Sequence, residues 1–83
     1  MNLEDMNKLK KIIAQVKEVD ESEIKQDFNL VDAGFNSITF IKLIIAIENY
    51  FSFEFEDDDL DIFKLQTLNK LVEYIENKRQ KME

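Results

Sequence analysis

Near the start of the chain, apolar residues recur at intervals of three and four, the spacing of one face of an α-helix. The recurring residues are Leu3, Met6, Leu9, Ile12, Ile13 and Val16. Glu4 and Asp5 suit the positive start of such a helix, and Lys17 suits its negative end. The pattern predicts an amphipathic helix over residues 3–17, with its other lysines on the solvated face.

A second helical pattern follows Gly34, the only glycine of the chain, and runs without glycine or proline over residues 37–51. At about 100° per residue, one set of apolar residues shares a side and predicts a core face: Phe40, Leu43, Ile44, Ile47 and Phe51. Ile38, Ile41 and Ile45 also have helical spacing but point roughly the opposite way. We call them the contact strip. Either another helix covers this strip, or it is an exposed surface that binds a partner.

The remaining segments predict two further helices and two connections. A short third helix is expected over residues 57–63, and Thr67 is a suitable N-cap for a final helix over about 67–78. Residues 77–83 are expected to form a frayed charged tail. Residues 51–56 alternate like a strand but have no partner strand, so we expect an extended linker that buries Phe53 and Phe55. Residues 18–36 form a long first loop held by scattered apolar anchors. The chain thus predicts one all-α domain over residues 1–83.

Composition excludes much chemistry. The chain has no cysteine and no histidine, so it lacks a thiolate nucleophile and the commonest general base and metal ligand. This removes most hydrolytic chemistry, and we expect no enzymatic activity of the chain itself. The acidic run from Glu54 to Asp61 does not continue as a calcium loop, because Ile62 stands where glycine is needed and Leu68 where a glutamate is needed. No metal site is predicted.

Charge and hydropathy narrow the partners and the location. A net charge of −7 argues against nucleic acid and favours basic patches on partner proteins. No apolar run is long enough to span a membrane, and the polar first residues do not form a signal peptide. We expect a cytoplasmic monomer.

The candidate chemistry lies where the second helix begins. Asn36 and Ser37 are both good N-cap residues. Either choice puts the Ser37 hydroxyl at the start of the helix, where free N–H groups and the macrodipole favour an anion. A hydrolase is excluded, because no histidine can activate Ser37.

The segment Asp32-Ala33-Gly34-Phe35-Asn36-Ser37-Ile38, with the isoleucine-rich helix behind it, resembles the attachment motif of acyl and peptidyl carrier proteins. The resemblance covers nearly the whole chain. It implies a small four-helix bundle of three longer helices and one short one, with a long first loop. It also implies a 4′-phosphopantetheine arm, supplied by coenzyme A through a phosphopantetheinyl transferase and joined to Ser37, which holds acyl or aminoacyl groups as thioesters. The helix that Ser37 opens would be the partner-recognition helix.

Two residues bear on the kind of carrier. Asn36 stands where acyl carriers usually have aspartate, and Lys42 stands on a helix whose exposed face is acidic in fatty-acid carriers. Both features look more like peptidyl carriers of nonribosomal assembly lines, loaded by an adenylating enzyme and served by downstream synthase or transferase enzymes. We expect partner contacts at Asn36, Ile38, Ile41, Lys42 and Ile45.

Other functions stay open. A fatty-acid, polyketide or D-alanyl carrier is an alternative cargo class. A non-carrier alternative is a helical adaptor that uses the contact strip, with Ser37 only a cap. The initial Met1 and the compact length favour a stand-alone protein.

Overall fold

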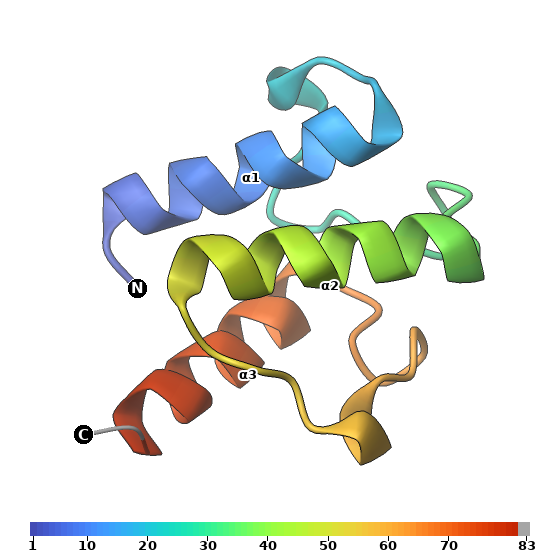
Figure 1. Ribbon diagram of the computed structural model, residues 1–83. Coiled ribbons are helices and arrows are strands. Elements are labelled where there is room, and N and C mark those ends of the chain that lie inside the picture. The colour runs from blue at the N-terminus through green and yellow to red at the C-terminus, as the bar shows by residue number, and fades with distance from the viewer. Residues whose placement is uncertain (82–83) are drawn as a thin grey trace.

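The computed structural model describes residues 1–81, and within them it contains helices, short 3-10 turns and connecting loops. The order is α1 (Leu3–Lys17), η1 (Glu21–Glu23), α2 (Ser37–Phe51), η2 (Asp57–Asp59) and α3 (Leu68–Lys81). Figure 1 shows α1 and α2 running side by side in opposite directions, with α3 crossing below α2. The predicted all-α fold is confirmed.

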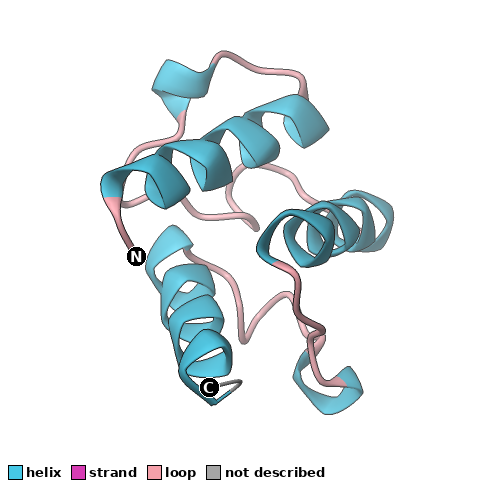
Figure 2. Cartoon of the chain, turned by 60° about the vertical axis from the view of Figure 1, so that its left-hand side comes forward, coloured by secondary structure: helices cyan, strands magenta, loops and turns pink. Residues whose placement is uncertain are grey.

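Figure 2 shows the three long helices arranged around a common centre. The buried side chains of these helices and of the loops form one hydrophobic core. Every residue of the predicted core face of α2 is buried. The most completely buried side chains come from all three helices and from the first loop: Leu9, Ile13, Ile24, Leu30, Leu43, Ile47, Leu68, Leu71 and Ile75. Phe53 and Phe55 are also buried, so the linker after α2 is extended and anchored as expected.

The first loop is tied to the chain just before α3. The Leu30 N–H donates to the carbonyl of Gln66 at 2.7 Å, and the Leu68 N–H donates to the carbonyl of Phe28 at 3.1 Å. These bonds form an isolated antiparallel bridge between Asn29 and Thr67. Because the loop is held at its middle, the segment that leads into α2 starts from a fixed point.

The predicted helix over residues 57–63 is wrong in extent, since only Asp57–Asp59 forms a 3-10 turn. In a continuous helix Asp57 and Asp61 would face each other at i,i+4, and like charges at that spacing are destabilising. In addition, the Asp61 side chain accepts the Phe63 N–H at 2.8 Å. This local bond offers the backbone an alternative to the helix. The chain therefore makes a separate turn over residues 62–65, which the buried Leu65 anchors.

The final helix is longer than predicted. Thr67 caps it as expected, since its hydroxyl accepts the Lys70 N–H at 3.2 Å. The helix then continues to Lys81, so the tail predicted to fray from residue 77 is helical over 77–81; residues 82–83 lie outside the described part. Arg79 donates to Asp5 at 2.9 Å and Lys78 pairs with Glu56, so tertiary contacts hold the last turns.

None of the helices over residues 1–81 has both the length and the apolar character that crossing a membrane requires.

Candidate functional site

The turn before α2 has a hydrogen-bonded backbone, which fixes the direction in which the chain enters the helix. The Gly34 N–H donates to the carbonyl of Val31 at 3.1 Å, and the Phe35 N–H donates to that of Leu30 at 3.0 Å. This pair of bonds is a Schellman motif, which needs a left-handed residue at its end. Gly34 fills that position with φ +87°. A Cβ there would lie 3.3 Å from Nζ of Lys17, so both backbone and space favour glycine.

Asn36, not Ser37, is the N-cap of α2. Its Oδ1 accepts the N–H groups of Ile38 and Thr39, both at 3.0 Å. The Thr39 hydroxyl accepts the Asn36 N–H at 2.8 Å in return, which completes a capping box. The Asn36 side chain therefore has a structural task. Ser37 becomes the first residue of the helix, which frees its hydroxyl from capping.

Ser37 is exposed, and within residues 1–81 no hydrogen bond to its hydroxyl is found. The capping box satisfies the backbone N–H groups of Asn36, Ile38 and Thr39. The first turn contains no acid. An anion attached to the Ser37 oxygen would thus lie at the positive end of a 15-residue helix, without a carboxylate of that turn to repel it.

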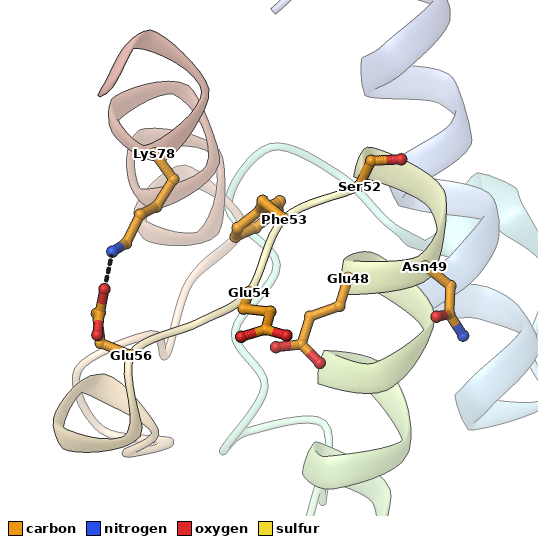
Figure 3. Close-up of a pocket in the computed structure, with 7 residues that line it drawn as sticks. All are labelled: Glu48, Asn49, Ser52, Phe53, Glu54, Glu56 and Lys78. Atoms are coloured by element: carbon orange, nitrogen blue, oxygen red, sulfur yellow. Dashed lines mark hydrogen bonds and ion pairs between the residues drawn. The ribbon is translucent and has the colours of Figure 1, made fainter. Parts of the chain in front are cut away.

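The other two serines lie in unfavourable surroundings for an anion. Ser22 belongs to η1, where its backbone N–H and hydroxyl lower the pKa of Asp20, so a carboxylate stays ionised beside it. Ser52 follows the negative end of α2, at φ 59°. It lines an open hollow of about 680 Å³ with three acids, Glu48, Glu54 and Glu56, and one base, Lys78, which pairs with Glu56, as Figure 3 shows. Of the three serines, only Ser37 is an exposed residue at the N-terminal end of a long helix.

The contact strip is exposed along α2: Ile38 is 68%, Ile41 45% and Ile45 51% exposed. The alternative that another helix of the chain covers this strip is therefore wrong. Asn36 and Lys42 are exposed with it, and in the described part of the chain Lys42 forms no ion pair. All five expected contact residues thus share a surface that begins at Ser37.

The structure adds a feature that the sequence analysis missed. An open groove of about 390 Å³ begins at Ser37 and lies between the start of α2 and the turn that follows η2; its lining is Phe35, Asn36, Ser37, Phe40, Ile41, Leu60, Asp61, Ile62 and Phe63. We call it the Ser37 groove. Phe63 is 65% exposed there. The sequence feature that could have indicated this groove is the concentration of apolar residues between Leu60 and Leu65, since one short turn cannot bury all of them.

The arrangement offers an acceptor hydroxyl without catalytic machinery. No histidine or cysteine exists anywhere in the chain. Over residues 1–81, no group of acids is arranged to hold a metal ion. The described residues therefore present an exposed hydroxyl with no histidine, thiol or metal-binding cluster beside it.

Comparison with known proteins identifies the class. Residues 7–75 match the family model described as "Phosphopantetheine attachment site". The match spans most of the chain, including the Gly34 turn and α2, and the chain belongs to this family of phosphopantetheine-binding carrier proteins.

Curated relatives agree with this membership. Proteins named "Acyl carrier protein" from Buchnera aphidicola, Lactobacillus johnsonii and Thermotoga maritima are 35%, 36% and 34% identical to the chain, over 75, 75 and 76 residues. The aligned regions cover 89%, 89% and 90% of this chain and 92%, 91% and 91% of the respective relatives. The protein is a non-catalytic carrier with a 4′-phosphopantetheine prosthetic group.

Proposed function

We propose that Ser37 carries the 4′-phosphopantetheine arm, through a phosphodiester on its hydroxyl oxygen. The observation that supports this most is that the Ser37 hydroxyl, at the first residue of α2, is exposed and does not serve as the helix cap. When bound, the group supplies a terminal thiol that holds acyl or aminoacyl groups as thioesters. The chain contributes a fixed attachment point, a positive helix end for the phosphate, and an exposed strip for the enzymes that act on it.

Incubation of the apo protein with coenzyme A and a broad-specificity phosphopantetheinyl transferase tests this assignment. Intact mass should show one added arm, and fragmentation should place it on Ser37. Ser37→Ala should take up none, while Ser52→Ala, the matched exposed serine at the other end of α2, should be modified like the wild type. Arm addition to Ser37→Ala would disprove the assignment.

For the cargo, we propose an aminoacyl or related aryl group, loaded by an adenylating enzyme of a nonribosomal assembly line. Lys42 lies exposed on the contact-strip face of α2. Glu48 is the only acid of that helix, and its carboxylate already accepts the Phe55 N–H at 2.9 Å. A partner that presents basic residues to this face would meet Lys42, and the apposition of like charges is unfavourable.

The names of the relatives favour an acyl cargo instead. A loading competition on the holo protein separates the two: adenylation domains with amino acids and ATP against a malonyl transferase with malonyl-coenzyme A. Aminoacyl loading without malonyl loading supports the proposal. Malonyl loading alone would overturn the cargo while leaving the Ser37 attachment standing.

The same proposal includes partners and place. The partners would be the phosphopantetheinyl transferase, the loading enzyme and the downstream synthase or transferase. Each of these enzymes would bind the same surface at a different stage, through contacts with Asn36, Ile38, Ile41, Lys42 and Ile45. The carrier would act as a monomer in the cytoplasm, where coenzyme A and ATP are available to these enzymes.

A further inference from the structure

We propose that Phe63 is an anchor for the enzyme that modifies Ser37, so that the docking surface spans two elements: the contact strip on α2 and the turn after η2. This rests on the proposed attachment at Ser37. The occupant we assign to the Ser37 groove is the phosphopantetheinyl transferase, through a surface with an apolar centre and with basic residues only at the edge that faces Asp61 and η2; Lys42 does not line this groove.

The geometry of the groove supports this assignment. Ser37, Ile41 and Phe63 line the same open groove. Any enzyme that brings its reacting atoms to the Ser37 oxygen has to stand over this surface. Aromatic side chains at the centre of an interface are common anchors of binding energy. At 65% exposure, Phe63 has most of its side chain available for such a contact.

The exposure of Phe63 does not come from a loose loop. The Asp61 carboxylate accepts its N–H at 2.8 Å, and the Asp61 carbonyl accepts the N–H groups of Lys64 and Leu65 at 2.9 and 3.1 Å. Leu65 is buried, so the turn is anchored in the core directly beyond Phe63. The backbone that carries Phe63 is therefore held in place, which limits the conformational entropy lost when a partner binds the side chain.

The charges around the groove indicate the chemistry of the partner. Asp61 lies in the groove wall, and Asp57, Asp58 and Asp59 precede it in η2. The one base of the turn, Lys64, donates to the carbonyl of Asp58 at 3.3 Å, so acids outnumber bases here. An apolar centre with an acidic rim fits a partner surface with an apolar pocket and basic residues at its edge.

The test is the rate of arm addition to the apo protein. Because the apo protein has no arm, a cargo lying in the groove cannot affect this rate. Phe63→Ala should raise the KM for the carrier about five- to tenfold at unchanged kcat, and Phe63→Leu should keep most of the affinity. Leu3→Ala is the matched control, because Leu3 is an apolar side chain of similar exposure (76%) on α1. Its KM should stay at the wild-type value.

An unchanged KM for Phe63→Ala would overturn the proposal, as would an equal rise for Leu3→Ala. A melting temperature equal to that of the wild type should accompany the KM effect, because the side chain is mostly outside the core. Failure of the Ser37 assignment gives a different result, since the wild type would then receive no arm on Ser37 at all.

Discussion

At the scale of single residues, the candidate site depends on three residues with different roles: Gly34, Asn36 and Ser37. Gly34 turns the chain in a conformation that other residues adopt at a cost. Asn36 closes the capping box, which frees the serine hydroxyl from that task. The position before the serine thus has a structural role that aspartate could fill equally well.

This role predicts the effect of changing the cap. Asn36→Ala should lower the free energy of unfolding by about 1 kcal/mol, because the N–H groups of Ile38 and Thr39 lose their acceptor. Asn36→Asp should leave it nearly unchanged, since both residues cap well. Urea unfolding followed by circular dichroism measures both. If Asn36→Ala were as stable as the wild type, the capping interpretation would fail.

At the scale of elements, α2 has two apolar faces with different tasks. One face is buried against α1, α3 and the loops, while the contact strip is exposed. Removal of a buried side chain leaves a cavity, whereas removal of an exposed one mainly alters a surface.

Alanine substitutions should therefore separate the two faces. Ile44→Ala or Ile47→Ala should destabilise the protein by roughly 2–5 kcal/mol. Ile41→Ala and Ile45→Ala should cost much less, partly because alanine favours helix, but should impair arm addition by the transferase. Denaturant midpoints and modification rates on the same variants give the comparison. Equal, large losses of stability on both faces would contradict the division.

A second element-scale feature is the attachment of η2 to α3 through Tyr74. The Tyr74 hydroxyl donates to Asp59 and accepts the Glu56 N–H, each at 2.9 Å, and its ring stacks on Phe55. Burial raises the pKa of the phenol, while the Glu56 N–H opposes this shift and the hydrogen bond to Asp59 adds to it; Lys78 lies nearby and partly offsets the effect of Asp59.

Tyr74→Phe should accordingly lower stability by about 0.5–2 kcal/mol at neutral pH. A raised folded-state pKa means that the contribution of the phenol is complete below its unfolded pKa of about 10 and is lost as pH rises through the folded value. The difference between wild type and variant should be constant from neutral to mildly alkaline pH and then shrink. Chemical denaturation at several pH values measures it, and a constant difference at high pH would refute the prediction.

At the scale of the whole molecule, charge is unevenly distributed. α1 has four lysines against two acids, while residues 54–61 contain six acids and no base. The chain has a net charge of −7 and is small, with a Cα radius of gyration of 11.8 Å. Net charge of this size opposes self-association, even with an exposed isoleucine strip.

We therefore expect a monomer of 9.9 kDa in solution. Sedimentation velocity from low to high micromolar concentration should give one species of that mass at moderate salt. A mass that rose with concentration would mean that the contact strip pairs copies of the chain, and Ile41→Ala should then reverse the rise.

The sequence by itself determined the elements whose causes are local. Periodicity and capping residues gave the bounds of α1 and α2, the core face of α2 and the position of Ser37, because such signals act within a few residues along the chain. The attachment motif also indicated the family, because this motif consists of a turn, a helix cap and a serine that follow one another directly in the sequence.

Only the tertiary structure decided features that depend on contacts distant in sequence. In the last turns of α3, Lys78 and Arg79 pair with Glu56 and Asp5, and no local pattern shows these contacts. The contact strip is exposed because no other element among residues 1–81 packs there, and periodicity cannot tell an exposed apolar face from a covered one. The Ser37 groove exists because folding brings Phe63 beside a serine 26 positions earlier in the chain.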